Sequence, residues 1–136
     1  MDRPVVVSVI PPTGGEANAR CERPWGWYET LAVGEGHLIK RIHIEPGARL
    51  SLQRHWHRSE QWLILGGQGR VRIGEQERAV RSGDALVVPL GAVHRAAAGS
   101  GGLDILEVQR GEHLSEEDIE RLEDDYGRLG AGAAPR

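Results

Sequence analysis

The sequence predicts an all-β domain, folded as an antiparallel sandwich or barrel. Eight or more short aliphatic runs follow one another along the 136 residues, and most of them are bounded by glycine or proline. The 19 glycines are spread between these runs, which is typical of turns between strands. No helical spacing of apolar residues interrupts the series, so the strands are not expected to alternate with crossover helices.

The strands are expected in the following order. Residues 5–10 form a candidate edge strand, which is followed by a loose connector. The runs 25–33 and 37–45 are joined by a short glycine-containing loop and predict a hairpin. A turn at Pro46 and Gly47 leads into a further strand within 48–57, and the remaining strands are expected at 62–65, 69–73, 77–80, 85–89 and 103–109.

One short helix is expected near the C-terminus. Ser115 precedes three acidic residues with the spacing of a capping box, and acids in a first turn suit the helix dipole. Apolar side chains then recur at helical spacing, at Ile119, Leu122, Tyr126 and Leu129. The expected organisation is an N-terminal strand and connector at 1–22, a single domain at 23–130 and a tail at 131–136.

Charge and composition argue against several classes of function. The formal net charge of −3 argues against a nucleic-acid partner, because such proteins usually carry a basic excess. The longest apolar runs fall far short of the roughly 20 residues of a membrane-spanning helix, so no membrane partner is expected. The N-terminus does not have the pattern of a secretory signal, and Cys21 is the only cysteine, so we expect a cytoplasmic protein without an internal disulfide.

Histidines and a carboxylate gather where a metal site could form. On a strand, Gln53, His55 and His57 project from one face, because side chains alternate. Glu60 follows closely, and His94 comes about 35 residues later, after a turn. Nitrogen and oxygen donors brought together inside a small barrel suit one divalent metal ion such as Zn, Mn, Fe or Co.

Lys40 stands out on the pattern of its strand alone. In residues 37–44 it shares a face with Leu38, Ile42 and Ile44, while His37 and the other polar side chains share the opposite face. A lysine in an apolar row is costly unless it is paired, faces a polar cavity or reaches solvent at the rim.

The spacing of these residues resembles the two motifs of the cupin superfamily. The first motif is matched by Gly47, Gln53, His55, Glu60 and Gly67, and the second by Gly83, Pro89, Gly91 and His94. The resemblance implies a double-stranded β-helix, the jelly-roll barrel of cupins. It also implies a metal ligand set in which Gln53 stands where most cupins have histidine; the set is Gln53, His55, Glu60 and His94.

Longer stretches at 23–31, 38–62 and 106–128 resemble the type II mannose-6-phosphate isomerases. This resemblance implies a metal-dependent interconversion of mannose 6-phosphate and fructose 6-phosphate through an enediol, with a small phosphosugar as ligand. Lys40 is then expected to face the substrate, and the general base is Glu107 or His57. Lys40 together with Arg58 or Arg128 is expected to neutralise the phosphate. Fold analogy favours a homodimer paired through sheet edges.

Three positions depart from the pattern of that family. Trp56 and Gln61 stand where histidine is usual, and Ala98 replaces an asparagine. Trp56 is expected to point outward, whereas Gln61 is expected nearer the metal ligands. These departures motivate an alternative, a non-catalytic sugar-binding or regulatory cupin that keeps the metal. Another metal-dependent cupin enzyme, such as a dioxygenase, is a third possibility, because the fold is shared by many chemistries.

Overall fold

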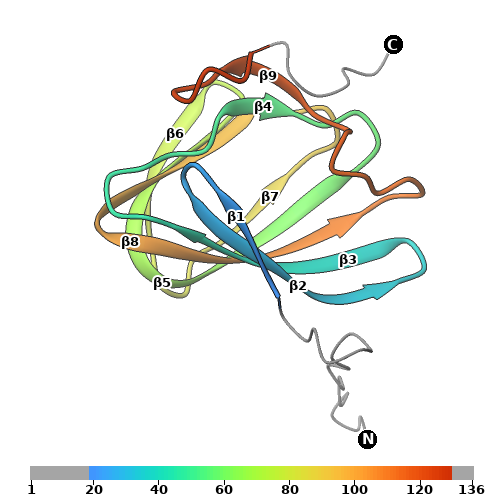
Figure 1. Ribbon diagram of the computed structural model, residues 1–136, viewed down its shortest axis with the longest axis horizontal. Helices are drawn as coiled ribbons and strands as arrows, with labels where there is room; N and C mark the ends of the chain where they lie inside the picture. The colour runs from blue at the N-terminus through green and yellow to red at the C-terminus, as the bar shows by residue number, and fades with distance from the viewer. Residues whose placement is uncertain (1–18, 130–136) are drawn as a thin grey trace, which may run out of the picture.

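The computed structural model describes residues 19–129 and folds them into nine β-strands (Figure 1). The strands are β1 Arg20–Arg23, β2 Gly26–Gly34, β3 His37–Ile44, β4 Leu52–Arg54, β5 Ser59–Ile73, β6 Gln76–Arg81, β7 Ala85–Val88, β8 His94–Arg110 and β9 Glu120–Glu123. Within this range no helix is long and apolar enough to cross a membrane. The candidate strand at residues 5–10 and the expected C-terminal tail lie outside the described residues.

All strand pairs are antiparallel, and two long strands organise the sheet. β8 pairs with β3, β4 and β5, while β5 also pairs with β6 and β7. The order β1-β2-β3-β8-β4-β9 runs along the rest of the sheet. Figure 1 shows how the sheet curls around its interior, with β4 and β9 side by side across one end. The prediction of an all-β domain is confirmed.

The inner face of the curled sheet is aliphatic. Ile44, Ile64, Leu103 and Ile105 are almost completely buried, and the core continues through side chains of β6 and β7. The alternation predicted for β3 is confirmed, because Lys40, Ile42 and Ile44 face inward together. Lys40 is therefore the charged member of an otherwise apolar row.

The runs 62–65 and 69–73 were expected as separate strands but form one strand, β5. Its register with β8 shifts twice, between Ile64 and Gly66 and again between Gly67 and Gly69. At these bulges the two backbones approach so closely that a Cβ at Gly67 would lie 2.1 Å from the carbonyl oxygen of Gly102. Glycine at this point therefore lets a long strand bend between the two halves of the barrel.

The prediction of a short C-terminal helix is wrong. The backbone NH of Glu117 donates to Ser115 Oγ, so the capping residue does start a turn. The chain then extends instead of coiling, because residues 120–123 form β9 and pair with β4. Leu122, expected on a buried helix face, is exposed. Tertiary strand pairing outweighs local helix propensity here.

Candidate metal centre and active site

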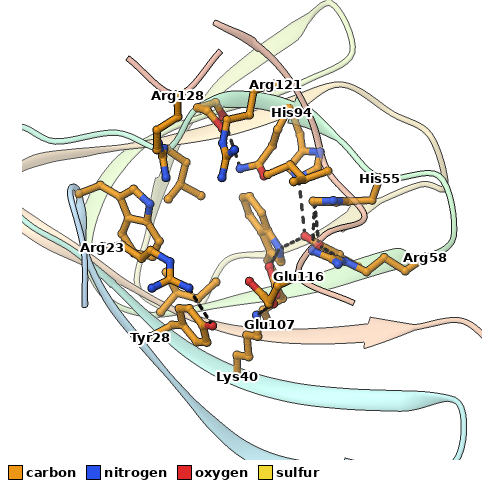
Figure 2. Close-up of a pocket in the computed structure, with 18 residues that line it drawn as sticks. Arg23, Tyr28, Lys40, His55, Arg58, His94, Glu107, Glu116, Arg121 and Arg128 are labelled. Carbon is orange, nitrogen blue, oxygen red and sulfur yellow. Dashed lines mark hydrogen bonds and ion pairs between the residues drawn. The ribbon is translucent and has the colours of Figure 1, made fainter. Parts of the chain in front are cut away.

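A pocket opens into the barrel between the inner faces of β3, β5 and β8 and the end formed by β4 and β9 (Figure 2). Both polar and apolar side chains line it. The charged side chains and histidines that line it are Arg23, Lys40, His55, Arg58, Glu60, His94, Glu107, Glu116, Arg121 and Arg128. All but one of the residues expected from the sequence to form the site lie in this pocket.

His55, Glu60 and His94 meet at one side of the pocket. His55 Nε2 lies 3.2 Å from Glu60 Oε2, and His94 Nε2 lies 3.7 Å from Glu60 Oε1. The ligand atoms of the three side chains all lie within 4.8 Å of one another, and all three residues are buried. These residues could therefore hold a metal ion, as the motif spacing predicted.

The hydrogen bonds of the two histidines fit a metal. Nδ1 of His55 lies 2.7 Å from the carbonyl oxygen of Asp118, and Nδ1 of His94 lies 2.9 Å from that of Ala92. A carbonyl oxygen can only accept, so Nδ1 carries the proton in both rings and each Nε2 keeps its lone pair. Burial, the positive charge of Arg58 and the neighbouring His94 lower the pKa of His55 to about 3, which keeps this imidazole neutral.

Gln53 also lines the pocket, and strand pairing places it beside a metal ligand. Its backbone partner across β4 and β8 is His94. The Gln53 side-chain amide donates to the carbonyl oxygen of Ser51, which leaves the amide oxygen as the available ligand atom. Two imidazoles, one carboxylate and one amide oxygen make a donor set that suits Zn, Mn, Fe or Co.

Arg58 is committed to the metal side of the pocket. Its guanidinium donates to Glu60 Oε2, to His55 Nε2 and to the carbonyl oxygen of Ser115, at 2.9, 3.2 and 3.1 Å. Although burial opposes ionisation of Glu60, interaction with His94 and the positive charge of Arg58 lower its pKa, so it is held as a carboxylate. Arg58 therefore engages the same atoms of His55 and Glu60 that a bound metal would take.

A second carboxylate, Glu107, lies beside Glu60 and is buried. Trp62 Nε1 donates to both carboxylates, at 3.0 Å to Glu60 Oε1 and 3.2 Å to Glu107 Oε1. Gln109 Nε2 donates to the other Glu107 oxygen at 2.8 Å. Burial and the neighbouring charge of Glu60 raise the pKa of Glu107, while the charge of Lys40 acts against this shift.

Lys40 faces the pocket from β3. Its ammonium group lies 4.0 Å from the centre of the Tyr28 ring and forms an ion pair with Glu116. Glu116 is half exposed and belongs to the segment that precedes β9. The lysine is therefore buried among an aromatic face and carboxylates, as its position in an apolar row requires.

His57 is the one candidate that the structure does not bring to the pocket. The strand expected to carry it ends at Arg54, and the chain bends at Trp56 and His57. The alternation that would place His57 beside His55 is lost at this bend. Its ring is exposed and makes an edge-on contact with His113, with the ring centroids 5.6 Å apart.

The three departures from the family pattern all lie outside the pocket. Trp56 is exposed and stacks under Arg54. Gln61 points outward from β5, so its expected place near the ligands is wrong; alternation puts it on the face opposite Glu60 and Trp62. Ala98 packs against the core where β8 pairs with β5.

Several residues in or next to the pocket were not anticipated individually. Trp62 bridges the two glutamates, and Asp118 clamps the bend by accepting from the backbone NH groups of Trp56 and His57. Arg23 and Arg121 reach the pocket from β1 and β9. The signal that could have found Arg23 is its position at the start of the conspicuous run RPWGWYE.

Comparison with known proteins identifies the family. Residues 15–124 match the family described as "Mannose-6-phosphate isomerase C-terminal". The alginate biosynthesis protein AlgA of Pseudomonas aeruginosa is 43% identical over 116 residues, which are 83% of this chain and 24% of AlgA. The mannose-1-phosphate guanylyltransferase ManC of Salmonella typhimurium is 41% identical over 108 residues, 79% of this chain and 22% of ManC. The chain thus spans about a quarter of the length of these relatives.

Solved structures agree on the fold. Oxalate decarboxylase from Bacillus subtilis superposes with a TM-score of 0.72 at 21% identity, over 89% of this chain and 34% of that one. A cupin-2 domain protein from Rhodospirillum rubrum gives 0.60 at 23% identity, over 68% and 67% of the two chains. The fold is that of a cupin, and the chain belongs to the mannose-6-phosphate isomerase C-terminal family.

Proposed function

We propose that this pocket is the active site of a metal-dependent isomerase that interconverts mannose 6-phosphate and fructose 6-phosphate. Membership of the family supports the class of reaction. The observation that carries the proposal is that one pocket joins a three-residue metal site to a buried carboxylate, Glu107, that is not one of the expected ligands.

The reaction needs this combination. Conversion of an aldose into a ketose moves the carbon-bound proton from C2 to C1 of the open-chain sugar, through an enediol. The hydroxyl proton moves from O2 to O1, so that the carbonyl passes from C1 to C2. Negative charge develops on the sugar oxygens as the carbon-bound proton leaves. A divalent metal held by His55, Glu60, His94 and Gln53 would stabilise that charge as a Lewis acid.

Glu107 is suited to carry the proton. It reaches into the pocket, and Trp62 and Gln109 fix both of its oxygens, so the carboxylate is oriented before the sugar binds. Its raised pKa makes it a stronger base than an exposed glutamate. The same residue can take the proton from C2 and return it to C1, which leaves the enzyme unchanged after each turnover.

Lys40 supports the base by its position. It is the cross-strand partner of Glu107, and its positive charge favours the ionised form that can accept a proton. Its Glu116 partner sits on a half-exposed segment at the mouth of the pocket. We propose that Lys40 contacts sugar oxygens next to the base when the substrate enters.

The alternative of a sugar-binding cupin without turnover was motivated by the departures Gln61 and Ala98. Neither lines the pocket, so neither supplies a reason for turnover to be lost. The alternative is therefore kept only as an outcome of the test.

The test is an assay of the purified chain with mannose 6-phosphate, after loading in separate samples with Mn, Zn, Co or Fe(II). Fructose 6-phosphate is detected by coupling to enzymes that consume it. We expect product in at least one sample and none after chelation. Saturable binding of mannose 6-phosphate with no product above the metal-only blank, for every metal, would establish the non-catalytic alternative instead.

A further inference from the structure

The side of the pocket opposite His55 and Arg58 carries a cluster of arginines (Figure 2), one of which, Arg121, is the cross-strand partner of Gln53. Arg23 comes from the end of β1, Arg121 from β9 and Arg128 from the segment after β9. Figure 2 draws these three guanidinium groups on the opposite side of the pocket from His55 and Arg58. We call this cluster the arginine wall (Arg23, Arg121 and Arg128).

The members of the wall are close enough to repel one another. Burial, and then the charges of Arg128 and Arg23, lower the pKa of Arg121, against the opposite influence of Asp124 and Glu116. Arg23 donates to two neutral oxygens, the carbonyl of Glu22 at 2.8 Å and the Tyr28 hydroxyl at 3.4 Å. An anion placed among the three guanidiniums would relieve this repulsion.

Arg128 is held in place by a carboxylate beneath it. Asp124 accepts from Arg128 Nε at 3.0 Å and from its terminal nitrogen at 2.8 Å, and also from its backbone NH at 2.6 Å. The side chain of Asp124 is buried by this contact, while that of Arg128 remains partly exposed. The guanidinium is therefore positioned in advance, and its remaining donors are available to a ligand.

The other cations of the pocket are less suited to bind an anion. Arg58 already donates to Glu60, His55 and Ser115, and it lies at the metal side. Lys40 is paired with Glu116 and packed on Tyr28. The two sides of the pocket therefore differ, with His55 and the engaged guanidinium of Arg58 on one side and the arginine wall on the other (Figure 2).

We propose that the arginine wall is a phosphate subsite, which binds the phosphate of a sugar monophosphate while the carbonyl end of the sugar faces His55, Glu60 and His94. Guanidinium groups bind phosphate oxygens in pairs, which gives both strength and orientation. The choice of a sugar phosphate rests on the proposed function, whereas the binding of phosphate by the wall does not. The subsite would select phosphorylated over free sugars and fix which end meets the metal.

The test is calorimetric titration of the metal-loaded chain with inorganic phosphate, mannose 6-phosphate and mannose. We expect Arg23→Gln, Arg121→Gln and Arg128→Gln each to weaken the binding of mannose 6-phosphate at least tenfold, because each removes a charge-assisted contact. Metal content and the circular dichroism spectrum should not change. Arg128→Lys, which keeps the charge but loses the paired donors, should lie between wild type and Arg128→Gln.

Arg70→Gln is the matched control, because Arg70 is exposed on β5 and outside the pocket. The Arg70→Gln variant should bind mannose 6-phosphate with the same affinity as wild type. Arg23 is itself exposed, so Arg23→Gln tests the wall even where a substitution at Arg121 unfolds the chain. The inference would be overturned if the folded arginine-wall variants bound inorganic phosphate and mannose 6-phosphate with wild-type affinity. It would also be overturned if only Arg58→Gln lost the binding of these ligands. If the chain binds phosphate through the wall but does not isomerise mannose 6-phosphate, the proposed function fails and this inference stands.

Discussion

Lys40 and Glu107 are direct partners across β3 and β8, and both side chains are buried facing the same pocket. Antiparallel pairing brings their Cβ atoms close together, so the positive charge of one acts on the carboxylate of the other. Glu107, whose pKa is shifted by these neighbours, thus lies beside the residues expected to bind a metal. Substitutions at the base and at the ligands therefore test different steps of the proposed reaction.

Glu107→Gln should abolish most of the turnover and leave binding nearly intact. Glutamine has the same shape and can still accept from Trp62, but it cannot take up a proton. We expect kcat to fall by about 100- to 10,000-fold, the usual range for loss of a positioned base. KM and metal content should change little. The measurement is steady-state kinetics with the metal that gives activity, and a kcat within about threefold of wild type would remove Glu107 from its proposed role.

His55→Ala and His94→Ala should each empty the metal site, because neutral imidazoles contribute much of the affinity for a divalent transition metal. Gln53→Ala should weaken binding less, because a neutral amide oxygen is a weaker ligand. The measurement is metal content per chain after purification without chelators, with circular dichroism to confirm folding.

His37→Ala is the matched control for this series. His37 is exposed on the opposite face of β3, so its loss should change neither metal content nor folding. Retention of full metal by His94→Ala, or loss of metal from His37→Ala, would contradict the ligand assignment.

Asp118→Ala should weaken metal binding although Asp118 is not a ligand. Its side chain accepts from two backbone NH groups at the bend after His55, and its carbonyl oxygen holds His55 Nδ1. Loss of such supporting contacts typically lowers metal affinity by about 10- to 100-fold. Competition with a chelator measures the change, and Glu117→Ala, at the exposed neighbouring position, should behave as wild type. Equal metal affinities in Asp118→Ala and Glu117→Ala would show that the hydrogen bonds of the Asp118 side chain have no influence on the metal site.

Asp124 should make stability depend on pH in the acid range. Hydrogen bonds from Arg128 lower its pKa from 3.8 to about 2. A carboxyl whose pKa is lowered by folding stabilises the fold fully above its unfolded pKa, and this contribution is lost as the pH falls through the folded value. Asp124→Asn should therefore lower the free energy of unfolding by on the order of 1 kcal/mol at about pH 6.

The difference between Asp124→Asn and wild type should then shrink as the pH falls from about 4 to about 2. Urea unfolding at several pH values gives both curves. A difference that stays constant across this range would mean that the ion pair with Arg128 contributes nothing through the charge of Asp124.

The sequence predicted which residues meet at the candidate metal site but not the whole pocket. His55, Glu60 and His94 were expected together because their spacing resembles the two cupin motifs, and the structure brings these three side chains together. His57 was misplaced because the alternation rule ends where the strand ends, and only the bend shows that. Arg23 and Arg121 of the arginine wall lie on the first and the last of the described strands, so no local sequence pattern could have predicted that they line the same pocket.

The expected helix failed for a related physical reason. The acidic turn after Ser115 has good local capping chemistry, but the backbone groups of residues 120–123 find partners on β4 instead. That pairing places Ile119 and Arg121 at the pocket, where a helix would have turned part of the segment away. Local propensity thus accounts for the start of the turn, and long-range hydrogen bonding decided what followed.

Interconversion of the two sugar phosphates, followed by NMR, tests the proposed reaction most directly. Wild-type chain loaded with the activating metal is incubated with mannose 6-phosphate in one sample and fructose 6-phosphate in another. We expect both samples to reach the same mixture, and Glu107→Gln to leave both unchanged over the same period. Starting sugars that remain unconverted with every metal, in chain that carries metal and is folded, would contradict the assignment of this pocket as an isomerase active site.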